Sequence, residues 1–202
     1  MQISDKKKYY ELSAKFLLEE LFGYDLEKSE HPDFHDRTKS IGIEVTQAMS
    51  KQEGEMIGFT EEIKDKKLVD ISANKIENFE KLGGKIFERN GVKWISFGDN
   101  LVSIDRLIAA INRKQKKLSS KHFTIYQSNQ LFLFSDRAPI KRNHVEAIVK
   151  GLAPNSTQVS FDLIHILSIS SLWTFSPDSI ESIIYRKIPK EILYQMSTML
   201  AQ

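Results

Sequence analysis

Apolar residues recur at helical spacing in several stretches of the chain. In residues 5–22 they return every third or fourth position until Gly23, and in residues 103–118 they form one stripe opposite a basic face. Both segments are predicted to be amphipathic helices, the first of which ends at the glycine. Helices are also expected over residues 142–150, 178–185 and 189–200, and the charged stretch 50–84 is expected to be mostly helical.

Alternation of apolar and polar residues marks the strands. In residues 41–46 it places Glu44 and Thr46 on one side of a strand and the isoleucine and valine side chains on the other. A short extended piece begins at residues 32–34, and residues 35–40 form the loop of a hairpin. Further strands are expected over residues 92–97, 130–134 and 160–167. Elements in this order predict an α/β fold with a mixed β-sheet flanked by helices.

Length and composition narrow the class of protein. The 202 residues predict a single domain, with a core over about residues 5–167 and a helical extension over about residues 176–202. Cysteine is absent, which excludes disulfides and thiolate metal sites. Without a secretory signal pattern or an apolar run of bilayer length, a cytoplasmic location without membrane contact is expected. The net charge of +2 is small, so a nucleic-acid partner has to be inferred from local basic clusters.

Two carboxylates are candidates for a metal site. If Asp33 ends the first strand of the hairpin, its side chain meets that of Glu44 on the second, and two such oxygen ligands suit Mg²⁺. The alternative is an aspartate in a turn followed by an edge strand with an exposed glutamate. His31 and His35 flank Asp33 and are expected to be solvated rather than catalytic.

The same residues resemble a known signature. Pro32-Asp33, ten intervening positions and Glu44-Val45-Thr46 are similar to the motif of the PD-(D/E)xK, or restriction-endonuclease-like, nuclease superfamily. The Gly-x-Glu pattern within the strand resembles an uncharacterised bacterial and phage-borne subgroup. The resemblance implies a restriction-endonuclease-like core, Mg²⁺ or Mn²⁺ as cofactor, and hydrolysis of DNA phosphodiesters.

The resemblance also implies an acidic residue in the first helix, about three turns before a glycine that ends it. Glu11, twelve residues before Gly23, fits this position and would complete the metal site with Asp33 and Glu44. Glu20 is the rival, because a helical wheel places it nearer the middle of the apolar stripe.

The superfamily's lysine is replaced here by Thr46, whose hydroxyl carries no charge. Gln47 could orient water if the strand kinks. A migrated lysine is the other possibility, because Lys114 and Gln115 face the sheet on a helical wheel of residues 103–118. In the alternative interpretation, in which neither residue has a role in the site, Gln115 is a hydrogen-bonded core amide and Lys114 is an edge residue whose ammonium group reaches solvent.

A basic stripe on the same helix gives the best candidate contact to a phosphate backbone, although such charges often form only a solvated face. It consists of Arg113, Lys116, Lys117 and Lys121. The leading hypothesis is a metal-dependent DNA nuclease, possible as a homodimer. The alternative is a catalytically degenerate nuclease fold that serves as a nucleic-acid-binding or protein-interaction module in phage or defence biology, and Thr46 favours it.

Overall fold

The chain forms two compact units, where its length predicts one domain. The computed structural model describes residues 3–48, 51–63, 65–89, 92–97, 103–135, 139–152 and 160–199. The larger unit joins Met1–Ala48 to Val102–Gln202, and Met49–Leu101 form the smaller one between them in sequence.

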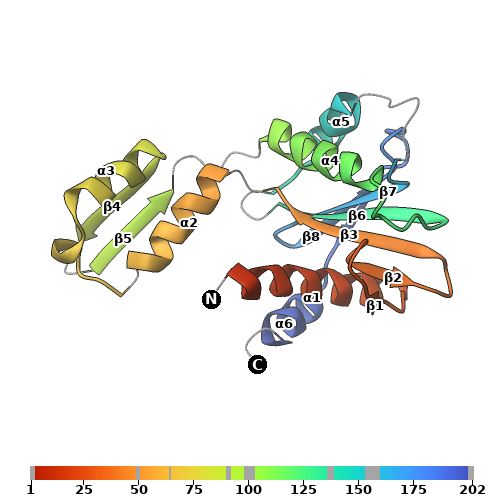
Figure 1. Cartoon of the computed structure of the whole chain (residues 1–202), viewed down its shortest axis with the longest axis horizontal. Helices are drawn as coiled ribbons and strands as arrows, with labels where there is room; N and C mark the ends of the chain where they lie inside the picture. The colour runs from red at the N-terminus through yellow and green to blue at the C-terminus, as the bar shows by residue number, and fades with distance from the viewer. Residues whose placement is uncertain are drawn as a thin grey trace. The chain divides into compact units, whose positions relative to one another are not determined.

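A seven-stranded mixed sheet organises the larger unit (Figure 1). Its order is β1-β2-β3-β6-β7-β8-β9, in which β3, β6 and β7 are parallel and the outer pairs are antiparallel. The strands are β1 (Glu27–Lys28), β2 (Phe34–Asp36), β3 (Ile41–Gln47), β6 (Ser128–Ser135), β7 (Leu163–Ser168), β8 (Ser171–Phe175) and β9 (Ile184–Lys187). The predicted α/β architecture with a mixed sheet flanked by helices is confirmed.

Helices cover both faces of this sheet. Figure 1 shows α1 (Ile3–Phe22) and α6 (Lys190–Met199) on one face, and α4 (Ile104–Leu118) and α5 (Arg142–Gly151) on the other. Helix α1 ends where predicted, because Gly23 adopts a φ of 62°, a conformation that costs glycine little. These four helices were all expected from the apolar periodicity.

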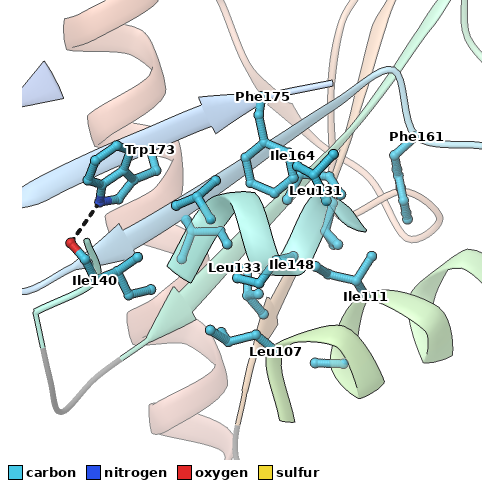
Figure 2. Close-up of a cluster of buried hydrophobic side chains, with 14 of the residues drawn as sticks. Leu107, Ile111, Leu131, Leu133, Ile140, Ile148, Phe161, Ile164, Trp173 and Phe175 are labelled. Carbon is cyan, nitrogen blue, oxygen red and sulfur yellow. Dashed lines mark hydrogen bonds between the residues drawn. The ribbon is translucent and has the colours of Figure 1, made fainter. Parts of the chain in front are cut away.

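Each face of the sheet has its own core, because side chains alternate along the strands. On β6, Leu131 and Leu133 pack under α4 and α5, whereas Phe132 and Phe134 pack under α1. Figure 2 shows the first of these cores, where the indole Nε1 of Trp173 donates a hydrogen bond of 3.2 Å to the carbonyl oxygen of Ile140.

The β2–β3 hairpin is fixed by polar contacts at its turn. Asp36 accepts hydrogen bonds from the backbone N–H groups of Thr38 and Lys39, both at 3.0 Å. Such aspartate contacts compete with strand pairing and favour turns. The strand β2 therefore runs on to Asp36, so that the loop is shorter than the predicted 35–40.

The helix predicted over residues 178–185 is wrong. This part of the chain makes a turn, held by the hydrogen bond of 2.7 Å from Ser176 N to Ser182 Oγ, and then enters β9. Pairing of β9 with β8 and of β8 with β7 overrides the local pattern. The described part of the predicted C-terminal extension, residues 176–199, is thus a turn and a strand followed by the helix α6.

The smaller unit combines helices with a hairpin. It contains α2 (Lys51–Ile63), the 3₁₀-helix η1 (Leu68–Asp70), α3 (Ala73–Lys81), β4 (Gly84–Arg89) and β5 (Val92–Phe97). Phe59 of α2 stacks on Phe79 of α3 with ring centroids 4.7 Å apart. The mostly helical prediction for residues 50–84 and the strand at 92–97 are confirmed, whereas β4 was not predicted.

Candidate functional site

Asp33 and Glu44 face each other at the open end of the β2–β3 hairpin. Phe34 pairs with Ile43 and His35 with Gly42, and the same register carried one step further sets Asp33 opposite Glu44. Both carboxylates are buried, with 5% of Asp33 and 1% of Glu44 exposed. Burial, together with the negative charge of Glu44, raises the pKa of Asp33 above its ordinary value. An exposed glutamate on an edge strand therefore does not describe Glu44.

The Asp33 carboxylate is anchored to the neighbouring strand. Its Oδ2 accepts a hydrogen bond of 2.8 Å from the backbone N–H of Val45. Between the two strands, Gly42 lets Pro32 and Tyr126 approach, since a Cβ atom there would lie 2.6 Å from Tyr126 Cδ2. The glycine two residues before Glu44 is thus required by packing beside the site.

Two lysines of α4 bind one oxygen of Glu44. The Nζ atoms of Lys114 and Lys117 lie 2.6 and 3.0 Å from Glu44 Oε1. Lys114 is the more enclosed, with 18% of its side chain exposed. The other oxygen, Glu44 Oε2, is buried and has no hydrogen-bond partner among the described residues. A buried carboxylate oxygen without a donor is costly, and a ligand that supplies positive charge would satisfy it.

Glu11 of α1 joins the site through two further lysines. Its carboxylate lies 2.6 Å from Lys28 Nζ and 3.3 Å from Lys7 Nζ, and Lys7 Nζ lies 4.0 Å from Asp33 Oδ1. Although burial of the carboxylate opposes it, these lysines lower the pKa of Glu11 below its ordinary value. Glu20, the rival candidate, is exposed.

The residues after Glu44 on β3 take different sides. Thr46 is half-buried, and strand alternation sets it on the face of Glu44. Gln47 belongs to the opposite face, where its Nε2 donates a hydrogen bond of 2.7 Å to Tyr10 Oη. The strand pairs regularly with β6 as far as Gln47, without the kink that would bring this amide to Glu44.

The helical phase predicted for α4 is confirmed. Gln115 is buried and its Oε1 accepts a hydrogen bond of 3.4 Å from Phe161 N, as a core amide does. Arg113 and Lys116 are exposed, and so is Lys121 in the turn after the helix. Lys117 departs from the predicted basic stripe, because it turns inward to Glu44.

Three of the histidines differ in how deeply their rings are buried. His31 is exposed, but the solvated environment predicted for His35 is wrong, because this ring is buried and stacks on Tyr126 with centroids 5.8 Å apart. His165 is a core residue whose ring nitrogens lie 2.9 Å from Thr174 Oγ1 and 3.0 Å from Gln130 Oε1. Burial lowers the pKa of His165 to about 3, so this ring is neutral at physiological pH.

The donor set fits a hard cation held by few protein ligands. Within the described ranges, no three histidine, aspartate or glutamate side chains are grouped as a metal site. Asp33 and Glu44 remain as a facing pair, and Glu11 contacts Lys7 and Lys28 much as Glu44 contacts Lys114 and Lys117. Mg²⁺ is commonly bound by one or two carboxylates, with water and substrate phosphate oxygens completing its shell. The pair fits such an ion, and the oxygen Glu44 Oε2, which accepts no hydrogen bond from the described residues, is the atom best suited to bind it.

No family model, curated protein or solved structure matches the chain. Among the described helices, none has the length and apolar character needed to cross a membrane.

Two site lysines escaped the prediction from sequence. Lys7 stands four residues before Glu11 on α1, a spacing that brings side chains together on a helix and could have revealed it. Lys28 reaches Glu11 only because β1 pairs with β2, so no local pattern in the sequence signals this contact.

Proposed function

We propose that this protein is a metal-dependent phosphodiesterase that hydrolyses DNA, and that Asp33 and Glu44 hold its Mg²⁺ or Mn²⁺ ion. The observation that carries the proposal is the pair of buried carboxylates, Asp33 immediately before β2 and Glu44 on β3, with a lysine bonded to Glu44. The resemblance of these residues to the PD-(D/E)xK signature supports it. The order of helix, hairpin, helix and further strands agrees with that superfamily's restriction-endonuclease-like core.

Lys114 takes the role of the superfamily's strand lysine, whose position in the motif is occupied here by Thr46. Its ammonium group reaches Glu44 from α4 instead of from the strand. A charged donor at this place can hold a phosphate oxygen and neutralise charge that develops on it during hydrolysis. Lys117, bonded to the same carboxylate oxygen, keeps that carboxylate in position when Lys114 turns toward a phosphate.

The other residues position the ligands. The backbone N–H of Val45 fixes the carboxylate of Asp33. Glu11 holds Lys7 close to Asp33, so that Lys7 would be a second cation, besides Lys114, to face a phosphate of the substrate. When bound, the divalent ion would supply a Lewis acid that lowers the pKa of a coordinated water. The exposed cations Arg113, Lys116 and Lys121 offer contacts to the phosphate backbone, which carry no sequence information.

The test is cleavage of plasmid and single-stranded DNA by the purified chain with Mn²⁺, Mg²⁺ or Ca²⁺. We expect cleavage to require the ion and to be faster with Mn²⁺, which binds nitrogen and oxygen ligands more tightly, while Ca²⁺ supports no turnover. Asp33→Ala and Glu44→Ala abolish cleavage, and Glu20→Ala, a matched change of an exposed glutamate on α1, leaves it intact. Metal-independent cleavage that survives both alanine substitutions would reject the mechanism.

One observation favours a second function for the protein. Position 46 holds a threonine, and the charge of the nearby Glu44 is already neutralised by two lysines. This arrangement also suits a nuclease fold that has lost its chemistry and serves as a binding module for nucleic acid or protein. If the wild type cuts nothing with either ion and Thr46→Lys gains cleavage, this second function replaces the first.

A further inference from the structure

The β4–β5 hairpin of the smaller unit has one packed face and one open face. Pairing sets Phe87 opposite Trp94, and alternation turns both away from the half-buried Ile86 and Ile95. The open face consists of Lys85, Phe87, Arg89, Val92, Trp94 and Ser96.

Two aromatic rings occupy the centre of this open face. Phe87 is 47% exposed and Trp94 is 52% exposed, and Val92 beside them is also exposed. Neither ring contacts another aromatic ring among the described residues. Large apolar side chains that gather on one surface mark an interaction site more often than single exposed ones do.

Cations flank the rings. Lys85 and Arg89 stand two residues before and after Phe87 on β4, so they share its face and are exposed. Neither has an ion-pair or hydrogen-bond partner in the part of the chain that the structure describes. The open face carries no carboxylate, because Glu88 belongs to the opposite face of the hairpin. The charge of this surface is therefore wholly positive, around an aromatic centre.

We propose that this open face binds an unpaired nucleic-acid strand, with bases stacked on Phe87 and Trp94 and phosphates held by Lys85 and Arg89. Surfaces that bind single strands combine cations along the backbone with aromatic rings on which bases stack. A duplex does not fit, because its bases are already stacked on one another. The proposal goes beyond the nuclease proposal, since it concerns strand binding by other residues and requires no cleavage.

The experiment titrates the full chain with fluorescein-labelled oligo(dT) or oligo(rU), with EDTA present so that no cleavage occurs. Anisotropy reports affinity, and quenching of tryptophan fluorescence reports stacking, since Trp94 is exposed and Trp173 is buried. We expect Trp94→Ala and Phe87→Ala each to weaken binding roughly 5- to 150-fold, the range for loss of one stacked base. Trp94→Phe keeps a ring and the affinity but loses the quenching.

The cations are tested through salt dependence. Lys85→Gln and Arg89→Gln each lower the slope of log affinity against log salt by about 0.7, as expected for one phosphate contact on a single strand. Val69→Ala in the same unit and Tyr194→Ala on α6 remove exposed apolar side chains elsewhere and serve as matched controls. Circular dichroism confirms that each variant is folded.

Three results would overturn the proposal. The first is wild-type affinity of Trp94→Ala for both oligonucleotides, and the second is equally tight binding of a duplex. The third is self-association, measured by sedimentation, that Trp94→Ala abolishes without changing oligonucleotide affinity, which would make the face an interface between copies. The nuclease proposal fails separately, because oligonucleotide binding is measured in EDTA and does not depend on whether the wild type cleaves DNA when a divalent ion is present.

Discussion

Replacing Lys114 with alanine removes the closer of the two cations that hold Glu44. Removing one partner of a buried ion pair costs about 3–5 kcal/mol, because the remaining charge stays buried. Here Lys117 still reaches the same oxygen at 3.0 Å, so we expect a smaller loss, about 2–3 kcal/mol. For a chain of 202 residues this lowers Tm by about 4–12 °C.

The same substitution should affect cleavage more than stability. If Lys114 neutralises charge on the phosphate, its loss slows cleavage about 10²–10³-fold, the range for removal of one donor to a developing oxyanion. Lys150→Ala is the matched control, because Lys150 is an exposed lysine of α5 outside the set proposed to contact DNA and should leave both Tm and rate nearly unchanged.

The assay combines calorimetry with cleavage rates in Mn²⁺, measured well below the Tm of each variant. A folded Lys114→Ala protein that cuts DNA at the rate of Lys150→Ala would refute the role of Lys114 in catalysis. An unchanged Tm would refute the ion pair with Glu44.

Three other predictions follow from the site. Thr46→Lys places a cation on the face of Glu44, so as a single substitution it should preserve or raise the rate of cleavage. In the Lys114→Ala background it should restore cleavage, and an inactive double variant would contradict the idea that the two lysines play the same role. The pKa of Asp33 is raised, so its contribution to stability is full below the unfolded pKa of about 3.9 and is lost as the pH rises through the folded pKa. Asp33→Asn should therefore gain stability relative to the wild type as the pH rises above about 4 in thermal melts, while losing activity, and a constant difference in stability would contradict this. Gly42→Ala forces a methyl group against Tyr126 and should cost about 1–3 kcal/mol, whereas Gly58→Ala, with open space around it in a helix, should be neutral or stabilising in the same melts.

Local patterns were enough to predict much of the site. Alternation along residues 41–46 predicts the side of the strand on which Glu44 lies, and the helical period over residues 103–118 predicts that Lys114 and Gln115 face the sheet. Both are properties of a single element, which a repeat of two or 3.6 residues determines. They place Glu44 and Lys114 without any knowledge of the tertiary fold, whereas the position of Asp33, which precedes β2 instead of ending the first strand as expected, depends on the pairing of β2 with β3.

Pairing between segments that are distant in sequence could not be predicted from such local patterns. The apolar stretch near residues 178–185 is short and its pattern predicts a helix, although pairing with β8 makes part of it the strand β9. The burial of His35 depends on Tyr126, which lies far away in sequence. Short apolar runs are ambiguous between helix and strand, and the choice depends on neighbours that the local sequence does not contain.

The central claim is that Asp33 and Glu44 together bind a divalent ion. A crystal structure of the wild type grown with Mn²⁺ tests it most directly, through the anomalous difference density at the manganese edge. We predict a peak within about 2.0–2.6 Å of a carboxylate oxygen of each residue, the range for hard cations and oxygen ligands. The absence of such a peak at saturating Mn²⁺, with Lys114 and Lys117 still bonded to Glu44, would contradict it.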